Sequence, residues 1–276
     1  MIFALGIFIG LVMGLTGAGG AILAVPLLMA LTSLPLVEAA PVALLTVASA
    51  AALGAYLAWR KSHVRYRAAG LMALIGALTA PLGLSVAVRV PNAWLSLLFS
   101  FVLAFVGLRL WRQAMGTLQE KAVDAAELQI SAEPRNERFC RLNDSTGRLI
   151  WTGSCTLCIA VTGAVTGFLS GLLGVGGGFF IVPALHSTTE LSMSSAVGTS
   201  LMAIALTSLG VVAVAVFKGH AVPVLLALPM IGGALLGICA GRSLAPYLSG
   251  AKLQLCFASL LGVVALQMAA RATGHF

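Results

Sequence analysis

The sequence predicts an all-α polytopic membrane protein that is built from two homologous repeats. Of its 276 residues, 60% are hydrophobic and only 9% are charged, whereas about a quarter of the residues of a soluble domain are charged. The apolar residues form long segments, most of them close to the roughly 20 residues that a spanning helix needs. Residues of the first half also recur in the second half at a constant offset of 157 positions.

Each repeat begins with a hydrophobic segment that glycines interrupt. This segment reads GLVMGLTGAGGAILAVPLL at residues 10–28 and GFLSGLLGVGGGFFIVPAL at residues 167–185. Because the second copy is internal, we expect the first to be part of the structure rather than a cleaved signal peptide. Further matches at the same offset are Ala39 with Ala196, Leu44 with Leu201, Lys61 with Lys218, His63 with His220 and Gly76 with Gly233.

Eight apolar segments follow one another along the chain. The first and the fifth, which contain the glycine clusters, are too long for one straight spanning helix. We expect each of these two to consist of two short helices that meet at a non-helical glycine turn. The eight segments are 2–31, 37–59, 68–88, 92–111, 151–186, 192–217, 221–245 and 250–270.

Each glycine segment either crosses the membrane as a broken helix or folds back as a re-entrant hairpin. Lys and Arg collect on the cytoplasmic side of membrane proteins, but both arrangements place thirteen of the sixteen on one side. Both therefore predict that the 60–67 loop and the linker are cytoplasmic. Eight true spans give parallel repeats, whereas two hairpins give inverted repeats. We favour eight spans.

A polar linker at 113–150 separates a first membrane repeat at 1–112 from a second at 151–276. Residues 113–129 have a helical composition, and residues 143–147 favour a small hairpin. The charges of the linker nearly cancel, which favours a solvated connector over a binding domain. The net charge of +8 lies in loops, where it reports topology and attraction to lipid headgroups rather than nucleic-acid binding.

The glycine clusters are the strongest candidate for a functional site. Non-helical backbone at membrane depth must be buried in protein or line a wet cavity, and glycine permits positive φ and close approach of a ligand. A short helix that begins after each turn would direct N–H groups and a positive dipole end at a small anion. For Gly10, Gly14, Gly167 and Gly171 we favour helix packing instead, and expect Gly171→Ala to be mild. The predicted substrate-binding glycines are Gly17, Gly19, Gly20, Gly174, Gly176, Gly177 and Gly178.

Hydroxyl groups near the sixth segment extend this candidate site. Thr199 and Ser200 follow Gly198, and their hydroxyls would complete the hydrogen bonds of a bound anion. The alternative is a bond back to a carbonyl of the same helix, which is common in membrane helices. We expect that local bond for Thr46, Ser49, Thr207 and Ser208.

No catalytic, metal or cofactor site is predicted. The GFLSG string at 167–171 has one residue too many for an intramembrane serine protease motif, and no GK[ST] follows the glycines. The apolar setting of Cys155 and Cys158 disfavours a redox thiolate. His63 and His220 fit an interfacial basic anchor, with proton coupling as the alternative.

The doubled glycine pattern with its Val-Pro, the A-x-G-T-S-L string at 196–201 and the four-plus-four layout resemble the sulfite exporter TauE/SafE family of membrane permeases. The resemblance covers nearly the whole chain outside the linker. It implies secondary transport of a small sulfur-containing anion, such as sulfite or a sulfonate, across the bacterial inner membrane. Residues 41–43 read PVA where 198–200 read GTS, so the two repeats need not contribute equally to a site.

The resulting hypothesis is a secondary carrier in which the two glycine turns meet at mid-membrane. Its expected partners are a small anionic substrate and the lipid bilayer, without nucleic acid or cofactor. A passive channel or a permease for another small solute is the alternative among transport functions. A membrane scaffold whose partner binds the linker is the alternative from a different class.

Overall fold

The computed structural model describes residues 1–17, 19–32, 34–61, 64–124, 152–189, 193–217, 223–245 and 250–272. These residues form ten α-helices, so the all-helical fold is confirmed. Six of the described helices, α3, α4, α5, α6, α8 and α9, are long and apolar enough to cross a membrane, as expected for a multi-pass protein. The helices are α1 (Ile2–Thr16), α2 (Gly20–Thr32), α3 (Leu36–Trp59), α4 (Tyr66–Arg89), α5 (Asn92–Asp124), α6 (Gly153–Leu173), α7 (Gly178–Thr188), α8 (Met193–Phe217), α9 (Val224–Leu244) and α10 (Gly250–Ala272).

Each glycine segment is broken into two helices at the glycine cluster, as predicted. Helix α1 ends at Gly17, whose φ is 85°, and α6 ends at Gly174, whose φ is 71°. Both angles lie in the left-handed region that glycine adopts without steric cost. The chain then starts a second, shorter helix, α2 or α7, within a few residues.

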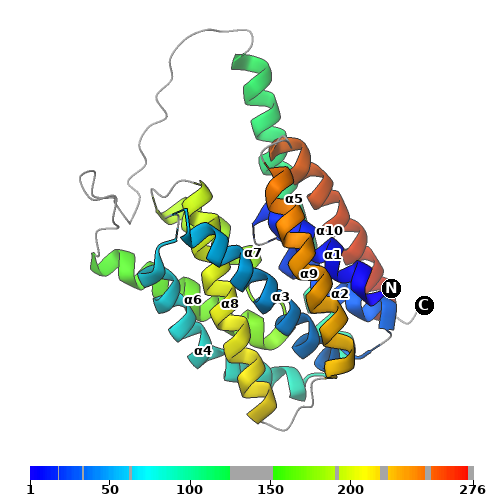
Figure 1. Cartoon of the computed structure of the whole chain (residues 1–276). Helices are drawn as coiled ribbons and strands as arrows, with labels where there is room; N and C mark the ends of the chain where they lie inside the picture. The colour runs from blue at the N-terminus through cyan, green and yellow to red at the C-terminus, as the bar shows by residue number, and fades with distance from the viewer. Residues whose placement is uncertain are drawn as a thin grey trace.

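The two halves of the chain interlock. Helix α1 packs along α9, α6 packs along α4, α3 packs on α8, and α5 packs on α10 (Figure 1). A shift of 157 residues converts the α1–α9 contact into the α6–α4 contact, and it exchanges α3 with α8 and α5 with α10. The first helix of each half is therefore held mainly by the other half.

Glycines let these helix pairs approach closely. A side chain at Gly10 would run into the backbone of Ala234 in α9, and one at Gly167 would run into the backbone of Gly76 in α4. The packing role predicted for these glycines is confirmed. The expected mild effect of Gly171→Ala is wrong, because the added methyl would meet the carbonyl group of Ala80 rather than open space.

The equivalent helices α3 and α8 run in opposite directions. Leu44, in the first half of α3, lines a small cavity together with Val211, near the end of α8. Gly54, near the end of α3, lies instead against Leu201, in the first half of α8. The operation that exchanges the two halves therefore reverses helix direction, which is the arrangement of inverted repeats.

Helices α1 and α2 form a hairpin whose two ends lie at the same end of the bundle. Helix α1 runs parallel to α9, since Gly6 lies against Met230 and Gly14 lies against Gly241. Helix α1 therefore begins at the same end of the bundle as α9. Helix α8 ends there, and the antiparallel helix α3 starts there. The chain enters at this end, turns at Gly17 and returns to it.

Helices α6 and α7 form the matching hairpin from the other end of the bundle, which we call the linker end because α5 leads from it into the linker. Helix α6 runs parallel to α4, with Gly163 against Met72 and Gly171 against Ala80. It therefore starts at the linker end, and α8 starts there too. The expectation of eight true spans is wrong. The count of basic residues gave the same ratio for both arrangements, and the direction of the chain after the glycine turns decides between them.

Helix α5 runs past the predicted end of the first membrane repeat and projects beyond the bundle to Asp124 (Figure 1). The helical composition noted for residues 113–129 accounts for this extension. The hairpin expected at 143–147 and the two histidines His63 and His220 lie outside the described residues.

Opposite faces of the membrane should be labelled at the two ends of the bundle. Arg60 lies at the end of α3, and Phe217, which is 91% exposed, lies at the end of α8. In a background without the native cysteines, an impermeant thiol reagent should reach Arg60→Cys and Phe217→Cys from different sides. Labelling of both from one side would restore the parallel, eight-span topology.

Candidate functional site

The glycine turn between α6 and α7 has an unusual backbone. Gly174, Gly176 and Gly177 have φ values of 71°, 73° and 66°, and all three are buried. No side chain caps the start of α7 at Gly177, while the N–H group of Phe180 donates to the Gly177 carbonyl at 3.1 Å. Three left-handed residues in four positions require glycine, because other residues adopt this region at a steric cost.

The turn between α1 and α2 is not a copy of the turn between α6 and α7. Among its described residues, positive φ occurs at Gly17, and α2 begins directly at Gly20. The Gly17 N–H group donates to the Met13 carbonyl at 2.8 Å, and the Ile22 N–H group donates to the Gly19 carbonyl at 3.1 Å. The chain thus needs fewer left-handed residues here to reverse its direction.

Each turn packs against a core helix of the other half. The atoms nearest to Gly17 belong to Val197 of α8, and those nearest to Gly174 belong to Ala40 of α3 and to Val25 of α2. Val197 and Ala40 are themselves related by the 157-residue offset. Helices α2 and α7 also touch each other, so the two hairpins approach through the helices that follow the turns.

The predicted hydroxyl ligands Thr199 and Ser200 bind protein backbone in this structure. Both are fully buried. The hydroxyl of Thr199 accepts a hydrogen bond from the N–H group of Arg65 at 3.0 Å, which fixes the start of α4 to α8. The hydroxyl of Ser200 donates to the Val197 carbonyl at 2.8 Å, one turn back in its own helix.

Ser208 departs from the local hydrogen bonding expected of it. Thr46, Ser49 and Thr207 donate to carbonyls of their own helices, as predicted. The Ser208 hydroxyl is fully buried and has no hydrogen-bond partner among the described residues. It lies instead against Gly176, where a Cβ atom would come within 2.6 Å of the Ser208 oxygen. The sequence placed Ser208 on the correct helix but did not show which neighbour it faces.

Among the described residues, buried hydroxyls are more frequent in the second half of the chain than in the first. At several positions the second half has Ser or Thr where the first half has an apolar residue, so its interior is the more polar of the two. A comparison of the two halves at the offset of 157 would have revealed this difference from the sequence. The pairs are Thr162 with Leu5, Thr166 with Ile9, Ser170 with Met13, Thr207 with Ala50 and Ser208 with Ala51.

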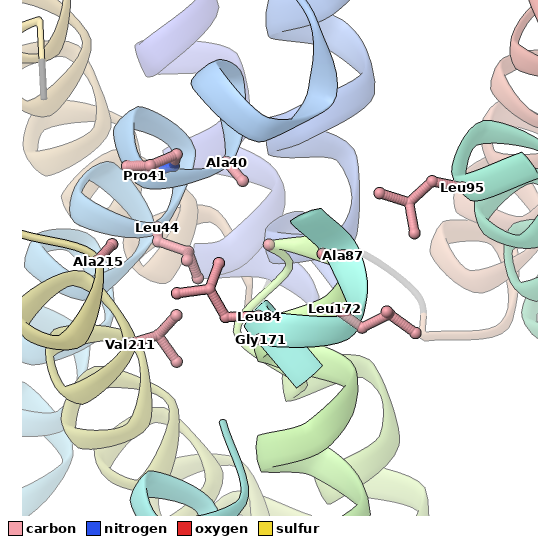
Figure 2. Close-up of a pocket in the computed structure, with 11 residues that line it drawn as sticks. Ala40, Pro41, Leu44, Leu84, Ala87, Leu95, Gly171, Leu172, Val211 and Ala215 are labelled. Atoms are coloured by element: carbon pink, nitrogen blue, oxygen red, sulfur yellow. The ribbon is translucent and has the colours of Figure 1, made fainter. Parts of the chain in front are cut away.

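A small apolar cavity lies beside Gly174, between α3, α4, α6 and α8. Its volume of about 20 Å³ has room for about one water molecule. Figure 2 shows Leu44, Leu84 and Val211 gathered beside Gly171 at this cavity. No titratable side chain lines it. The glycine turn is therefore closed by aliphatic side chains in this conformation.

Two arginines lie at the linker end of the core helices. Arg242 of α9 is half-buried and donates from its guanidinium group to the Gly54 carbonyl of α3. Arg65 has a buried Nε atom that has no partner among the described residues. No carboxylate pairs with either side chain within the described part of the chain. The sequence analysis counted Arg242 among the basic residues that report topology but did not propose it as part of a site.

The described residues also contain no group of three or more His, Cys, Asp or Glu side chains arranged to hold a metal ion.

Comparisons with known proteins agree on one family. The family described as sulfite exporter TauE/SafE matches residues 2–268. A probable membrane transporter protein of Xylella fastidiosa strain Temecula1 is 33% identical over 256 residues, which cover 88% of this chain and 84% of the relative. A second, from strain 9a5c, is 35% identical over 201 residues, or 71% of this chain and 66% of the relative. A probable membrane transporter protein of Haemophilus influenzae is 46% identical over 61 residues, or 20% and 23% of the two chains. No solved structure matches the chain.

Proposed function

The chain belongs to the sulfite exporter TauE/SafE family and is a membrane transporter. From this premise we propose that it carries a small sulfur-containing anion, sulfite or a sulfonate, across the bacterial inner membrane. In this proposal the protein is a secondary carrier that moves its substrate unchanged. The relatives are named as probable membrane transporters without a substrate, so the choice of anion rests on the family description and on the site.

One observation carries the proposal: two glycine-broken hairpins enter an inverted bundle from opposite ends. Broken helices at matching positions of inverted halves hold the substrate in many secondary transporters. The two halves exchange roles when one side opens and the other closes, so the turns become accessible alternately. The closed, aliphatic surroundings of Gly174 fit a state between these two openings.

The charges favour an anion over a cation. Among the described residues, Glu38 at the exposed start of α3 is the one acidic side chain outside the projecting part of α5. The described part of the bundle therefore offers no carboxylate to bind a cation at membrane depth. Arg65 and Arg242 supply positive charge at the linker end, and the start of α7 adds the positive end of a helix dipole.

Counterflow in proteoliposomes tests this function. Vesicles loaded with unlabelled sulfite should accumulate external radiolabelled sulfite, and internal thiosulfate, a sulfonate, sulfate or acetate should support this uptake to different extents. Empty liposomes are the control. Uptake supported by acetate but not by sulfur oxyanions would point to another solute. Equilibration without counterflow would indicate a channel, and no flux of any compound would favour a scaffold.

A further inference from the structure

Ser208 carries a buried hydroxyl that the fold leaves without a partner. The side chain is fully buried, and its oxygen has no hydrogen-bond donor or acceptor among the described residues. Buried polar groups in folded proteins are nearly always paired, and each exception calls for an explanation. An unoccupied ligand position is one such explanation.

The hydroxyl of Ser208 is directed at the glycine turn. A Cβ atom at Gly176 would lie 2.6 Å from the Ser208 oxygen, whereas its next neighbours, methyl groups of Ile204 and Val47, would be 3.5 and 3.6 Å away. Gly176 has a positive φ and lies two residues before the start of α7, an 11-residue helix whose N-cap, Gly177, provides no side-chain hydrogen bond. A hydrogen-bond donor, a backbone without a Cβ atom and a positive helix end therefore meet at one place.

A second unpaired hydroxyl lies at the same turn. Ser170 is also fully buried, and its side-chain oxygen has no partner among the described residues. The carbonyl group of Ser170 accepts the Gly174 N–H group at 2.9 Å, which places this residue one helical turn before the glycines. At the offset of 157 the first half has Met13 and Ala51 at these two positions, so its turn has no such hydroxyls.

We propose that Ser208 is a substrate-binding residue whose hydroxyl donates a hydrogen bond to an oxyanion held at the turn between α6 and α7. In the same proposal Ser170, which lies on α6 one helical turn before Gly174, provides a second donor. The binding site is thus asymmetric: the second half supplies the unpaired hydroxyls, while the hydroxyl at the turn of the first half, that of Thr16, already donates to the Val12 carbonyl. This inference rests on the proposed function, because it names the groups that recognise the transported anion.

Removal of the Ser208 hydroxyl distinguishes a role in substrate binding from a role in the stability of the fold. Ser208→Ala should raise the KM for radiolabelled sulfite about tenfold to a hundredfold, the loss expected for one hydrogen bond to a charged group. It should also reduce the rise in melting temperature that a given sulfite concentration produces. Without sulfite its melting temperature should equal or exceed that of the wild type, because the variant no longer buries an unpaired hydroxyl. Ser49→Ala, whose hydroxyl donates to its own helix, is the control and should keep the wild-type KM.

Two results of this comparison would overturn the inference. One is a wild-type KM in Ser208→Ala. The other is a fall in melting temperature that accounts for the lost flux, since this would indicate a structural role.

Thiol labelling tests the site without relying on flux. In a background without the native cysteines, Ser208→Cys should react with the sulfonate-bearing reagent methanethiosulfonate ethylsulfonate. A simple alkylsulfonate, which unlike sulfite does not react with the reagent, should slow the reaction. Thr207→Cys, the buried neighbour whose hydroxyl donates within α8, should stay unreactive. If no compound is transported but position 208 is labelled, the proposed function fails while the oxyanion site stands. An unreactive Ser208→Cys would reject the site.

Discussion

Gly177→Val is expected to abolish anion flux and to lower the melting temperature of the protein. The φ of Gly177 is 66°, a conformation that costs roughly 1–3 kcal/mol for a residue other than glycine and more for a β-branched one. The new Cβ atom would also lie 2.7 Å from the carbonyl oxygen of Thr166 in α6. Both effects push α7 away from α6 and displace the turn that we propose holds the anion.

The measurement for Gly177→Val is flux per folded, membrane-inserted protein, with the melting temperature recorded alongside. The contact with Thr166 adds a loss of stability, so flux must be normalised to the folded fraction. Gly262→Val in α10, where no atom lies within 4 Å of the added Cβ position, is the matched control and should transport normally. Wild-type flux from folded Gly177→Val would exclude the turn from the mechanism.

Gly167→Val should disrupt the contact between α4 and α6 and destabilise the protein by about 3 kcal/mol, the upper range for an overpacked interior. The added side chain would face the Cα and carbonyl atoms of Gly76, so the two helix backbones must separate. A backbone cannot rotate away as a flexible side chain does. The expected readout is a melting temperature lower by several degrees and a larger aggregated fraction after detergent extraction.

Gly70→Val provides the control for this helix pair. Gly70 lies near the start of α4, and nothing lies within 4 Å of its Cβ position. Valine there should change the unfolding free energy by less than about 0.5 kcal/mol, as is usual for a surface substitution. Equal melting temperatures for Gly167→Val and Gly70→Val would show that the close approach of α4 and α6 does not stabilise the fold.

Much of this fold follows from local sequence features. Runs of apolar residues mark the spanning helices. Gly17 and Gly174 mark the breaks, because glycine adopts positive φ without a steric cost whatever its neighbours. The path after each break depends on tertiary contacts. The hairpin between α1 and α2 is set by packing of Gly6 and Gly14 on α9, far along the chain. Both paths place thirteen of the sixteen Lys and Arg residues on one side, so their count does not distinguish the two.

The candidate site shows the same limit. The sequence pointed to the glycines of the second turn, and the structure places Gly176 and Gly177 in left-handed conformations. It also pointed to hydroxyls on α8, but the partner of each hydroxyl depends on side-chain direction. Thr199 binds the start of α4, whereas Ser208 faces the turn without a partner. Successive side chains on a helix differ in direction by about 100°. Periodicity therefore gives the direction of a side chain on its helix but not the residue that it contacts.

The interlocked halves also govern the order in which the protein is completed during synthesis. Helix α1 is made first, yet the surface that packs on its glycines belongs to α9, which begins at Val224. The first hairpin therefore cannot pack on α9 until most of the chain has been synthesised. Helix α4, by contrast, is synthesised before α6, which packs on it. The beginning of the polypeptide is among the last parts to reach its final position.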